Sequence, residues 1–183
     1  TTGNAINERQ SEMGEYKDLI TFKGNPLTLV GDNVEVGQAA PDFAAVANDL
    51  TDVDLASHRG KVVIISAVPS LDTPVCDMQA RTFNEEAGRL GDRVVVLTIS
   101  MDLPFAQKRW CGAAGAEHVQ TLSDYKDRRF GQAYGLYIKE LGLLTRAVIV
   151  VNPDGTINYK QIVPEVTDEP DYEAALEAAR VPV

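Results

Sequence analysis

The sequence predicts a single α/β domain in which a mixed β-sheet is flanked by helices on both faces. Nearly continuous apolar runs at residues 61–68, 93–99 and 146–151 are rich in β-branched side chains, as expected of strands covered on both sides. Segments with helical signals follow the first two of these runs. The chain has 183 residues, 44% of them hydrophobic, which is enough for one core of ordinary size and short for two domains.

The N-terminal part divides into a polar arm and a hairpin. Residues 1–18 are polar and show neither strand nor helix periodicity, so we expect an arm, native or left over from expression, ahead of a domain over 19–183. Short apolar segments at 20–22 and 27–30 flank Lys23-Gly24-Asn25-Pro26 and indicate an N-terminal β-hairpin at the edge of the fold.

The segment from residue 74 to about 90 predicts one helix with an apolar face. Its apolar residues are spaced by four, three, four and three positions, and they are Cys76, Ala80, Phe83, Ala87 and Leu90. Thr73 is a favourable N-cap and Pro74 suits the first helical position, so the helix should begin there. Cys76 then lies in its first turn.

The later segments complete the order of elements. Asn152-Pro153-Asp154-Gly155 fits a type I turn, which would join the third apolar run to another strand as a hairpin. The other expected elements are a helix over 104–111 stopped by Gly112, a helix over 127–134, a strand over 156–163 and a helix from Pro170 to about 179. This order of strands and helices favours a thioredoxin-like fold.

Composition excludes several classes of partner. Seventeen Lys and Arg against 27 Asp and Glu leave a net charge of −10, which repels nucleic-acid phosphates and anionic lipid. No stretch approaches the roughly 18 consecutive apolar residues of a membrane helix, so we expect a soluble protein with neither membrane nor nucleic acid as partner. Two cysteines are too few for a disulfide scaffold, which favours a reducing, cytoplasmic setting.

Cys76 is the candidate for chemistry. The segment from Pro69 to Cys76 leaves the expected central strand and enters a helix, which is where open α/β sheets place their sites. A thiol in the first helical turn faces free backbone N–H groups and the positive end of the helix dipole, and both favour the nucleophilic thiolate. The same residue also lies on the apolar stripe, so a buried core cysteine is an equal alternative by position alone.

The residues around Cys76 resemble a known family. Pro69-x-x-x-Thr73-x-x-Cys76 is similar to the peroxidatic motif of peroxiredoxins, and Pro69-Ser-Leu-Asp-Thr73-Pro-Val-Cys76 followed by Arg81-Thr-Phe83-Asn84 resembles their thiol peroxidase branch. A second block at 102–115, which contains Cys111, resembles the resolving-cysteine segment of that branch. The resemblance continues through 133–135, 146–148 and 169–176 and covers nearly the whole chain after about Phe22.

The resemblance implies a thiol-dependent peroxidase of the atypical two-cysteine type. Hydrogen peroxide and alkyl hydroperoxides would be reduced to water or alcohols while Cys76 becomes a sulfenic acid. Cys111 would resolve that acid as an intrachain disulfide, which thioredoxin would reduce again. The resemblance also implies a homodimer. Because the two cysteines are expected on different helices, we predict that the bridge requires one of those helices to unwind locally.

Three further residues complete the expected site. Thr73 would donate a hydrogen bond to a peroxide oxygen or to the thiolate, although it could also be a plain helix cap. Pro69 would shield the thiolate from water and fix the loop. Arg146 would face the thiolate and bind the peroxide oxygens, whereas the residues alone favour a surface charge that opens a strand.

Other readings of the chemistry are weaker or remain open. His58 and His118 lie far apart in the sequence and lack zinc-site spacing, and we find neither a P-loop nor a Gly-x-Gly-x-x-Gly sequence, so no metal, flavin or nucleotide cofactor is expected. A disulfide reductase would need C-x-x-C, which is absent. The remaining alternative is a thioredoxin-fold redox or binding module without peroxidase activity.

Overall fold

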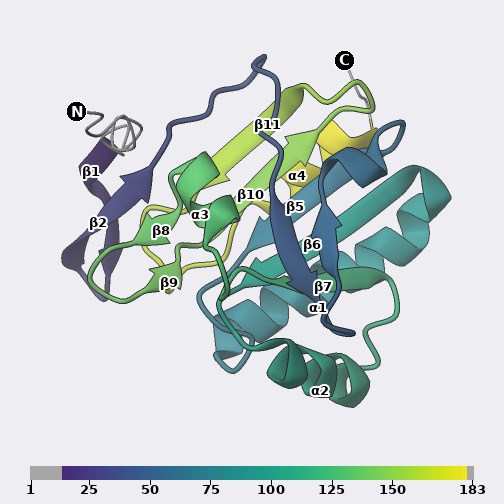
Figure 1. Ribbon diagram of the computed structural model, residues 1–183, viewed down its shortest axis with the longest axis horizontal. Coiled ribbons are helices and arrows are strands. Elements are labelled where there is room, and N and C mark those ends of the chain that lie inside the picture. The colour runs from purple at the N-terminus through teal and green to yellow at the C-terminus, as the bar shows by residue number, and fades with distance from the viewer. Residues whose placement is uncertain (1–13, 181–183) are drawn as a thin grey trace, which may run out of the picture.

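The computed structural model describes residues 14–180 and contains two sheets. The main sheet has seven strands in the order β11-β10-β5-β6-β7-β3-β4 (Figure 1). These strands are β3 (Ala44–Ala47), β4 (Asp52–Asp54), β5 (Val62–Ala67), β6 (Val94–Ser100), β7 (Val119–Ser123), β10 (Ala147–Val151) and β11 (Ile157–Ile162). Strands β5, β6 and β7 are parallel, whereas β10, β11, β3 and β4 join by antiparallel pairing. The mixed sheet predicted from the sequence is confirmed.

A smaller sheet of four strands packs at one end of the domain, with the order β1-β2-β8-β9 (Figure 1). Its strands are β1 (Gly14–Phe22), β2 (Asn25–Gly31), β8 (Tyr137–Ile138) and β9 (Leu143–Leu144). The first two strands form the expected N-terminal hairpin. Its turn, at Lys23 and Gly24, uses left-handed backbone at both residues.

Helices cover both faces of the main sheet. They are α1 (Pro74–Leu90), α2 (Pro104–Ala114), α3 (Arg129–Tyr134) and α4 (Tyr172–Arg180), with short 3₁₀ turns η1 (Ala56–His58) and η2 (Gly91–Arg93). Side chains of β5 alternate between the faces: Val62 and Ile64 pack with α1 and α4, whereas Val63 and Ile65 pack with α3. Both faces are therefore buried, which explains why the strand is a continuous apolar run.

Two predicted boundaries are wrong. The arm was expected to reach residue 18, but β1 begins at Gly14, and residues 1–13 lie outside the described part of the chain. Asp18 has positive φ (66°) at an irregularity in the β1–β2 pairing, and this break conceals the strand periodicity of Tyr16 and Ile20. Helix α2 does not stop at Gly112 but runs to Ala114, because the left-handed cap is Gly115 (φ 63°).

Smaller differences concern the other helices and the five strands that were not predicted, which are β3, β4, β7, β8 and β9. Helix α3 begins at Arg129, two residues late, because Arg128 is left-handed (φ 54°). Helix α4 begins at Tyr172 and not at Pro170. Strand β7 was not predicted, since its sequence VQTLS buries polar side chains and lacks an apolar pattern. The predicted turn at 152–155 is confirmed, with Gly155 N donating to Asn152 O at 2.9 Å.

Candidate active site

Cys76 lies in the first turn of α1, at the carboxyl end of β5. Its side chain is fully buried, in an apolar cluster with Val68, Leu71 and Ala80, against which Trp110 packs. The helix begins where expected because Thr73 is extended (φ −102°, ψ 147°) and Pro74 follows it. This position places a buried thiol at the amino end of a long helix.

Thr73 does not cap the helix with its side chain, contrary to the expectation. Its Oγ1 donates to the carbonyl oxygen of Ser70 at 2.9 Å, and no side-chain hydrogen bond to a helix N–H forms. Its backbone N–H also donates to Ser70 O, at 3.1 Å, so the residue closes a tight turn between strand and helix. Thr73 is exposed at this turn, whereas Pro69 is buried.

Arg146 brings a buried positive charge to the Cys76 sulfur. Its Nη2 lies 3.2 Å from Cys76 Sγ, and only 2% of the residue is exposed. Pairing of β10 with β5 places Ala147 opposite Ala67, which sets the guanidinium beside the loop that enters α1. The alternative of a surface charge is therefore wrong: the guanidinium lies inside the protein and contacts the thiol.

Gln79 holds the guanidinium in place and was missed by the sequence reasoning. Its Oε1 accepts from Arg146 Nη1 at 2.9 Å, and its Nε2 donates to Ser66 Oγ at 2.8 Å, in fully buried surroundings. The carbonyl of Val166 accepts from Arg146 Nε at 2.9 Å. A polar residue one turn after Cys76, beside the apolar stripe, is the sequence signal that could have revealed it.

The contacts of Arg146 favour a thiolate at Cys76. Within the described chain, its hydrogen-bond partners are a carbonyl, an amide oxygen and the cysteine sulfur, and none of them is a carboxylate. A buried cation without a counter-charge is costly, and an anion on the sulfur would offset that cost. The arrangement therefore places a fixed cation in direct contact with the Cys76 sulfur.

A largely apolar pocket of about 250 Å³ opens beside this site. Its lining comes from four segments, namely the turn before α1 with the start of that helix, the tip of the β1–β2 hairpin, the residue before β10 and the loop after β11. The lining residues are Phe22, Lys23, Pro69, Thr73, Pro74, Val75, Arg146, Val166 and Thr167. The hairpin tip thus completes a wall that the thioredoxin-like core does not supply by itself.

Glu165 forms hydrogen bonds with two of the segments that line the pocket, the β1–β2 hairpin and the loop after β11. Its carboxylate accepts from Thr21 Oγ1 (3.0 Å) and Gly24 N (2.8 Å) on the hairpin, and from Thr167 N (3.0 Å) on its own loop. The hydrogen bond from the Thr167 backbone, then that from Gly24, lowers the pKa of Glu165 to about 2. This carboxylate therefore stays charged at neutral and mildly acidic pH.

Cys111 occupies a different environment on α2. It is half-buried beside an open groove of about 360 Å³, and its Sγ lies 3.4 Å from Thr121 Oγ1 and 3.9 Å from Asn48 Nδ2. Thr121 donates its own hydroxyl proton to Asn48 Oδ1 at 2.8 Å, so the Cys111 thiol is left to donate to Thr121. The three groups form a ring of hydrogen-bonding partners that carries no formal charge besides the thiol itself. Both cysteines are free, and the structure does not bring them together.

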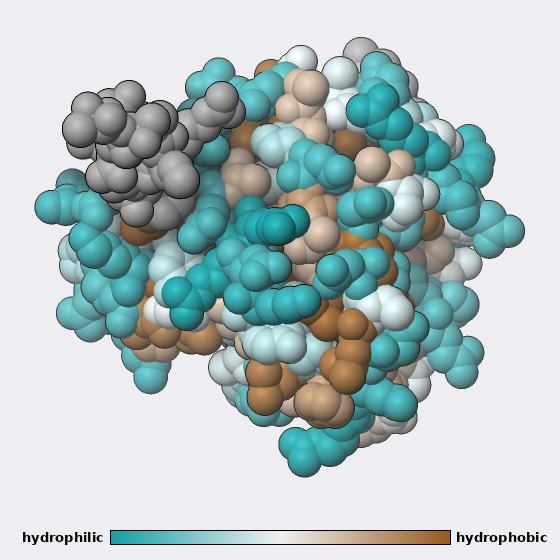
Figure 2. Space-filling model, in the orientation of Figure 1, coloured by the Kyte–Doolittle hydropathy of each residue, from teal (hydrophilic) through white to brown (hydrophobic). Residues whose placement is uncertain are grey.

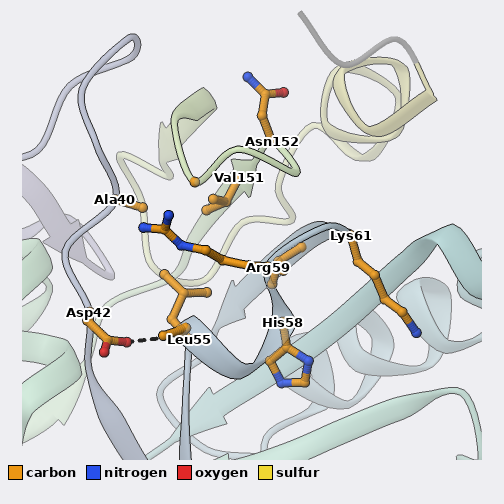
Figure 3. A pocket seen from close by; sticks show the side chains of 11 residues that line it. Ala40, Asp42, Leu55, His58, Arg59, Lys61, Val151 and Asn152 are labelled. Atoms are coloured by element: carbon orange, nitrogen blue, oxygen red, sulfur yellow. Dashed lines mark hydrogen bonds between the residues drawn. The ribbon is translucent and has the colours of Figure 1, made fainter.

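A second pocket, shown in Figure 3, lies at the opposite end of the sheet strands from Cys76 and holds only about 40 Å³. Arg59, His58 and Lys61 line it but point in different directions, so their charges do not converge (Figure 3). Burial, and then the charge of Lys61, lower the pKa of His58. This pocket has no group suited to the chemistry of Cys76.

Residues 14–180 contain neither a cluster of metal-ligating side chains nor a membrane-spanning helix. No group of three or more His, Cys, Asp or Glu side chains in that range is arranged to hold a metal ion. None of the helices in the same range is long and apolar enough to cross a membrane.

Comparisons with known proteins define the class. The family model described as Redoxin matches residues 35–176. The chain therefore belongs to the Redoxin family. A peroxiredoxin-like protein from Aquifex aeolicus has a similar structure, with a TM-score of 0.83 and 38% identity over 92% of this chain and 97% of that one.

Relatives named thiol peroxidase narrow the class of protein further. Thiol peroxidases from Halalkalibacterium halodurans and Bacillus subtilis are 58% and 57% identical to this chain over 161 residues, which cover 88% of the chain and 96% of each relative. A thiol peroxidase from Chromobacterium violaceum shares the fold, with a TM-score of 0.77 at 20% identity over 86% of this chain and 93% of that one. The chain is accordingly a thiol-dependent peroxidase, as the sequence motifs indicated.

Proposed function

We propose that Cys76 is the attacking thiol of this peroxidase and that Arg146 is its counter-charge. The observation that carries the proposal is the 3.2 Å contact between Arg146 Nη2 and Cys76 Sγ inside the protein. Substrates would be hydrogen peroxide and alkyl hydroperoxides, which enter through the largely apolar pocket beside the site.

In the first step the Cys76 thiolate attacks the terminal oxygen of the hydroperoxide. A sulfur–oxygen bond forms as the O–O bond breaks, and the second oxygen leaves as water or an alcohol after it takes up a proton. Negative charge passes from sulfur to oxygen, so donors held beside both atoms lower the barrier. Arg146 supplies one set of donors. Thr73 supplies another when its hydroxyl exchanges the bond to Ser70 for one to peroxide.

Pro69 has a structural part in the same step. It is buried and lines the pocket. Its ring lacks an N–H group and restricts φ, so it shields the sulfur from water and fixes the turn.

In the second step Cys111 resolves the sulfenic acid. Its thiol condenses with the sulfenic acid of Cys76, releasing water and leaving an intrachain disulfide, which thioredoxin reduces by thiol–disulfide exchange. The Cα atoms of a disulfide lie within about 7 Å, so the first turn of α1 or the helix α2 has to unwind. We further propose that the protein works as a homodimer in a reducing, cytoplasmic setting.

A coupled assay tests these roles. Purified protein is supplied with an organic hydroperoxide, thioredoxin, thioredoxin reductase and NADPH, and NADPH consumption is compared between the wild type, Cys76→Ser and Cys111→Ser. We expect Cys76→Ser to lose all activity. Cys111→Ser, the matched cysteine variant, should consume about one equivalent of peroxide and then stop, because its sulfenic acid forms but is not passed to thioredoxin.

Two results would contradict the proposal. Equal NADPH consumption by the wild type and Cys76→Ser would remove Cys76 from the attacking role. Full thioredoxin-dependent turnover by Cys111→Ser would remove Cys111 from the resolving role. A non-catalytic binding module, the alternative left open by the sequence, would consume no peroxide in any of the three forms.

A further inference from the structure

The indole of Trp110 joins the two helices that carry the cysteines. Its Nε1 donates to Asp77 Oδ1 at 2.8 Å, which connects α2 to α1. Asp77 follows Cys76 in the sequence, and Trp110 precedes Cys111. One hydrogen bond therefore links the immediate neighbours of both thiols.

Further contacts hold this junction. Both carboxylate oxygens of Asp77 accept from Arg81 Nε, at 2.9 and 3.0 Å, and the Arg81 guanidinium lies 5.9 Å from the centre of the Trp110 ring. The ring also packs against the apolar cluster that contains Cys76. An exposed ion pair alone contributes little, but here it orients the acceptor of a hydrogen bond whose donor is half-buried.

Trp110 and Cys111 are consecutive on α2, and the directions of their side chains link the Trp110–Asp77 hydrogen bond to the position of Cys111. Successive residues of a helix point about 100° apart. With Trp110 directed at α1, Cys111 is directed at β7 and the β3–β4 turn, where it contacts Thr121 and Asn48. For Cys111 to reach Cys76, this part of α2 or the first turn of α1 has to turn or unwind, and either movement separates Trp110 from Asp77.

We propose that Trp110 and Asp77 are a positioning pair that sets how fast the disulfide forms relative to further oxidation of Cys76. The proposal rests on the proposed function. Once Cys76 is a sulfenic acid, it either condenses with the Cys111 thiol, releasing water, or reacts with a second hydroperoxide, which transfers one oxygen to give a sulfinic acid and leaves as water or an alcohol. The pair holds the helices in the arrangement that keeps Cys111 away, so its loss favours the disulfide.

The test compares the two fates of Cys76 in Trp110→Phe, Asp77→Ala and the double variant. Intact mass spectra after peroxide treatment separate the disulfide, which has lost two hydrogens, from the sulfinic acid, which has gained two oxygens. We expect the peroxide concentration that gives half sulfinic acid to rise roughly three- to tenfold in each single variant, as for the loss of one hydrogen bond. The double variant should exceed neither single variant, because both changes remove the same bond.

Control variants separate the bond from other effects. Asp77→Asn keeps an oxygen acceptor for the indole and should stay close to the wild type, which distinguishes the bond from the charge near Cys76. Glu85→Ala breaks an exposed ion pair with Arg89 on the same helix and should change nothing. The rate of sulfenic acid formation, measured for each change in a Cys111→Ser background, corrects the ratio for altered reactivity of Cys76.

The fluorescence of Trp110 can be followed in the unsubstituted protein, because Trp110 is the single tryptophan of the chain. Its emission should change in the peroxide-independent phase in which the disulfide forms, and an unchanged emission in that phase would overturn the proposal. So would equal sulfinic acid in the wild type and all variants, or additive effects in the double variant. If the wild type forms no intrachain disulfide at all, the proposed role of Cys111 fails first and the positioning pair falls with it.

Discussion

The two thiols of this protein sit in contrasting surroundings. Cys76 is fully buried, begins a helix and touches the guanidinium of Arg146. Cys111 is half-buried near the end of another helix and shares a neutral ring of hydrogen bonds with Thr121 and Asn48. A cation that has no carboxylate partner stabilises an anion beside it, whereas a ring without formal charge does not. On the proposed function, this difference in surroundings would set the order in which the two thiols react.

Loss of Arg146 should have the largest effect on the difference in reactivity between the two thiols. We expect Arg146→Gln to slow the reaction of Cys76 with hydroperoxide roughly 10²- to 10³-fold, because the variant loses both the counter-charge and the donors to the separating oxygens. Stopped-flow measurement of peroxide consumption in a Cys111→Ser background checks this. Arg180→Gln, which changes a half-exposed arginine at the end of α4, serves as the matched control. A fall of less than threefold would show that the guanidinium does not set the reactivity of Cys76.

A second prediction concerns the strand behind Cys111. Strand β7, which carries Thr121, leads into Asp124, whose pKa burial raises to about 6. The folded state then binds a proton that the unfolded state releases between pH 4 and 6, so the stability contributed by Asp124 falls as pH rises through that range. The change amounts to about 3 kcal/mol at most.

Denaturant unfolding at several pH values checks the prediction for Asp124. The free energy of unfolding of the wild type, relative to Asp124→Asn, should decrease between pH 4 and 6 and stay level above pH 7, because asparagine does not titrate. Asp92→Asn, an exposed substitution on η2, should leave the pH profile of the wild type unchanged. A parallel profile for the wild type and Asp124→Asn would contradict the raised pKa.

The smallest expected effect concerns the ring around Cys111. Thr121→Val keeps the shape of the side chain but removes the acceptor for the Cys111 thiol, so we expect the disulfide to form about two- to threefold faster, as for one weak hydrogen bond. Quenched samples analysed by intact mass give the rate. Thr98→Val makes the same chemical change on β6, where the hydroxyl has no partner among the described residues, and should leave the rate unchanged. A slower disulfide in Thr121→Val would mean that the ring activates Cys111 instead of holding it.

Much of the fold could be predicted from local patterns. The apolar runs predicted β5, β6 and β10, and Thr73 with Pro74 located the start of α1 to the residue. The predictions failed where a single residue overrides a pattern, as Asp18 does in β1 and Gly115 does at the end of α2. They also failed for β7, because its buried Thr121 and Ser123 are satisfied by partners distant in the sequence.

The sequence by itself determined which residues could do chemistry here. A thiol in the first turn of a helix, preceded by threonine and proline at fixed spacing, is a local feature that depends only on backbone geometry. Only the tertiary structure decided which charge meets that thiol. Arg146 is 70 residues away along the chain, and the pairing of β10 with β5 brings it beside Cys76. The contacts of Gln79, Val166 and Trp110 also depend on the tertiary structure, because the packing determines which hydrogen-bond partner lies beside each polar group.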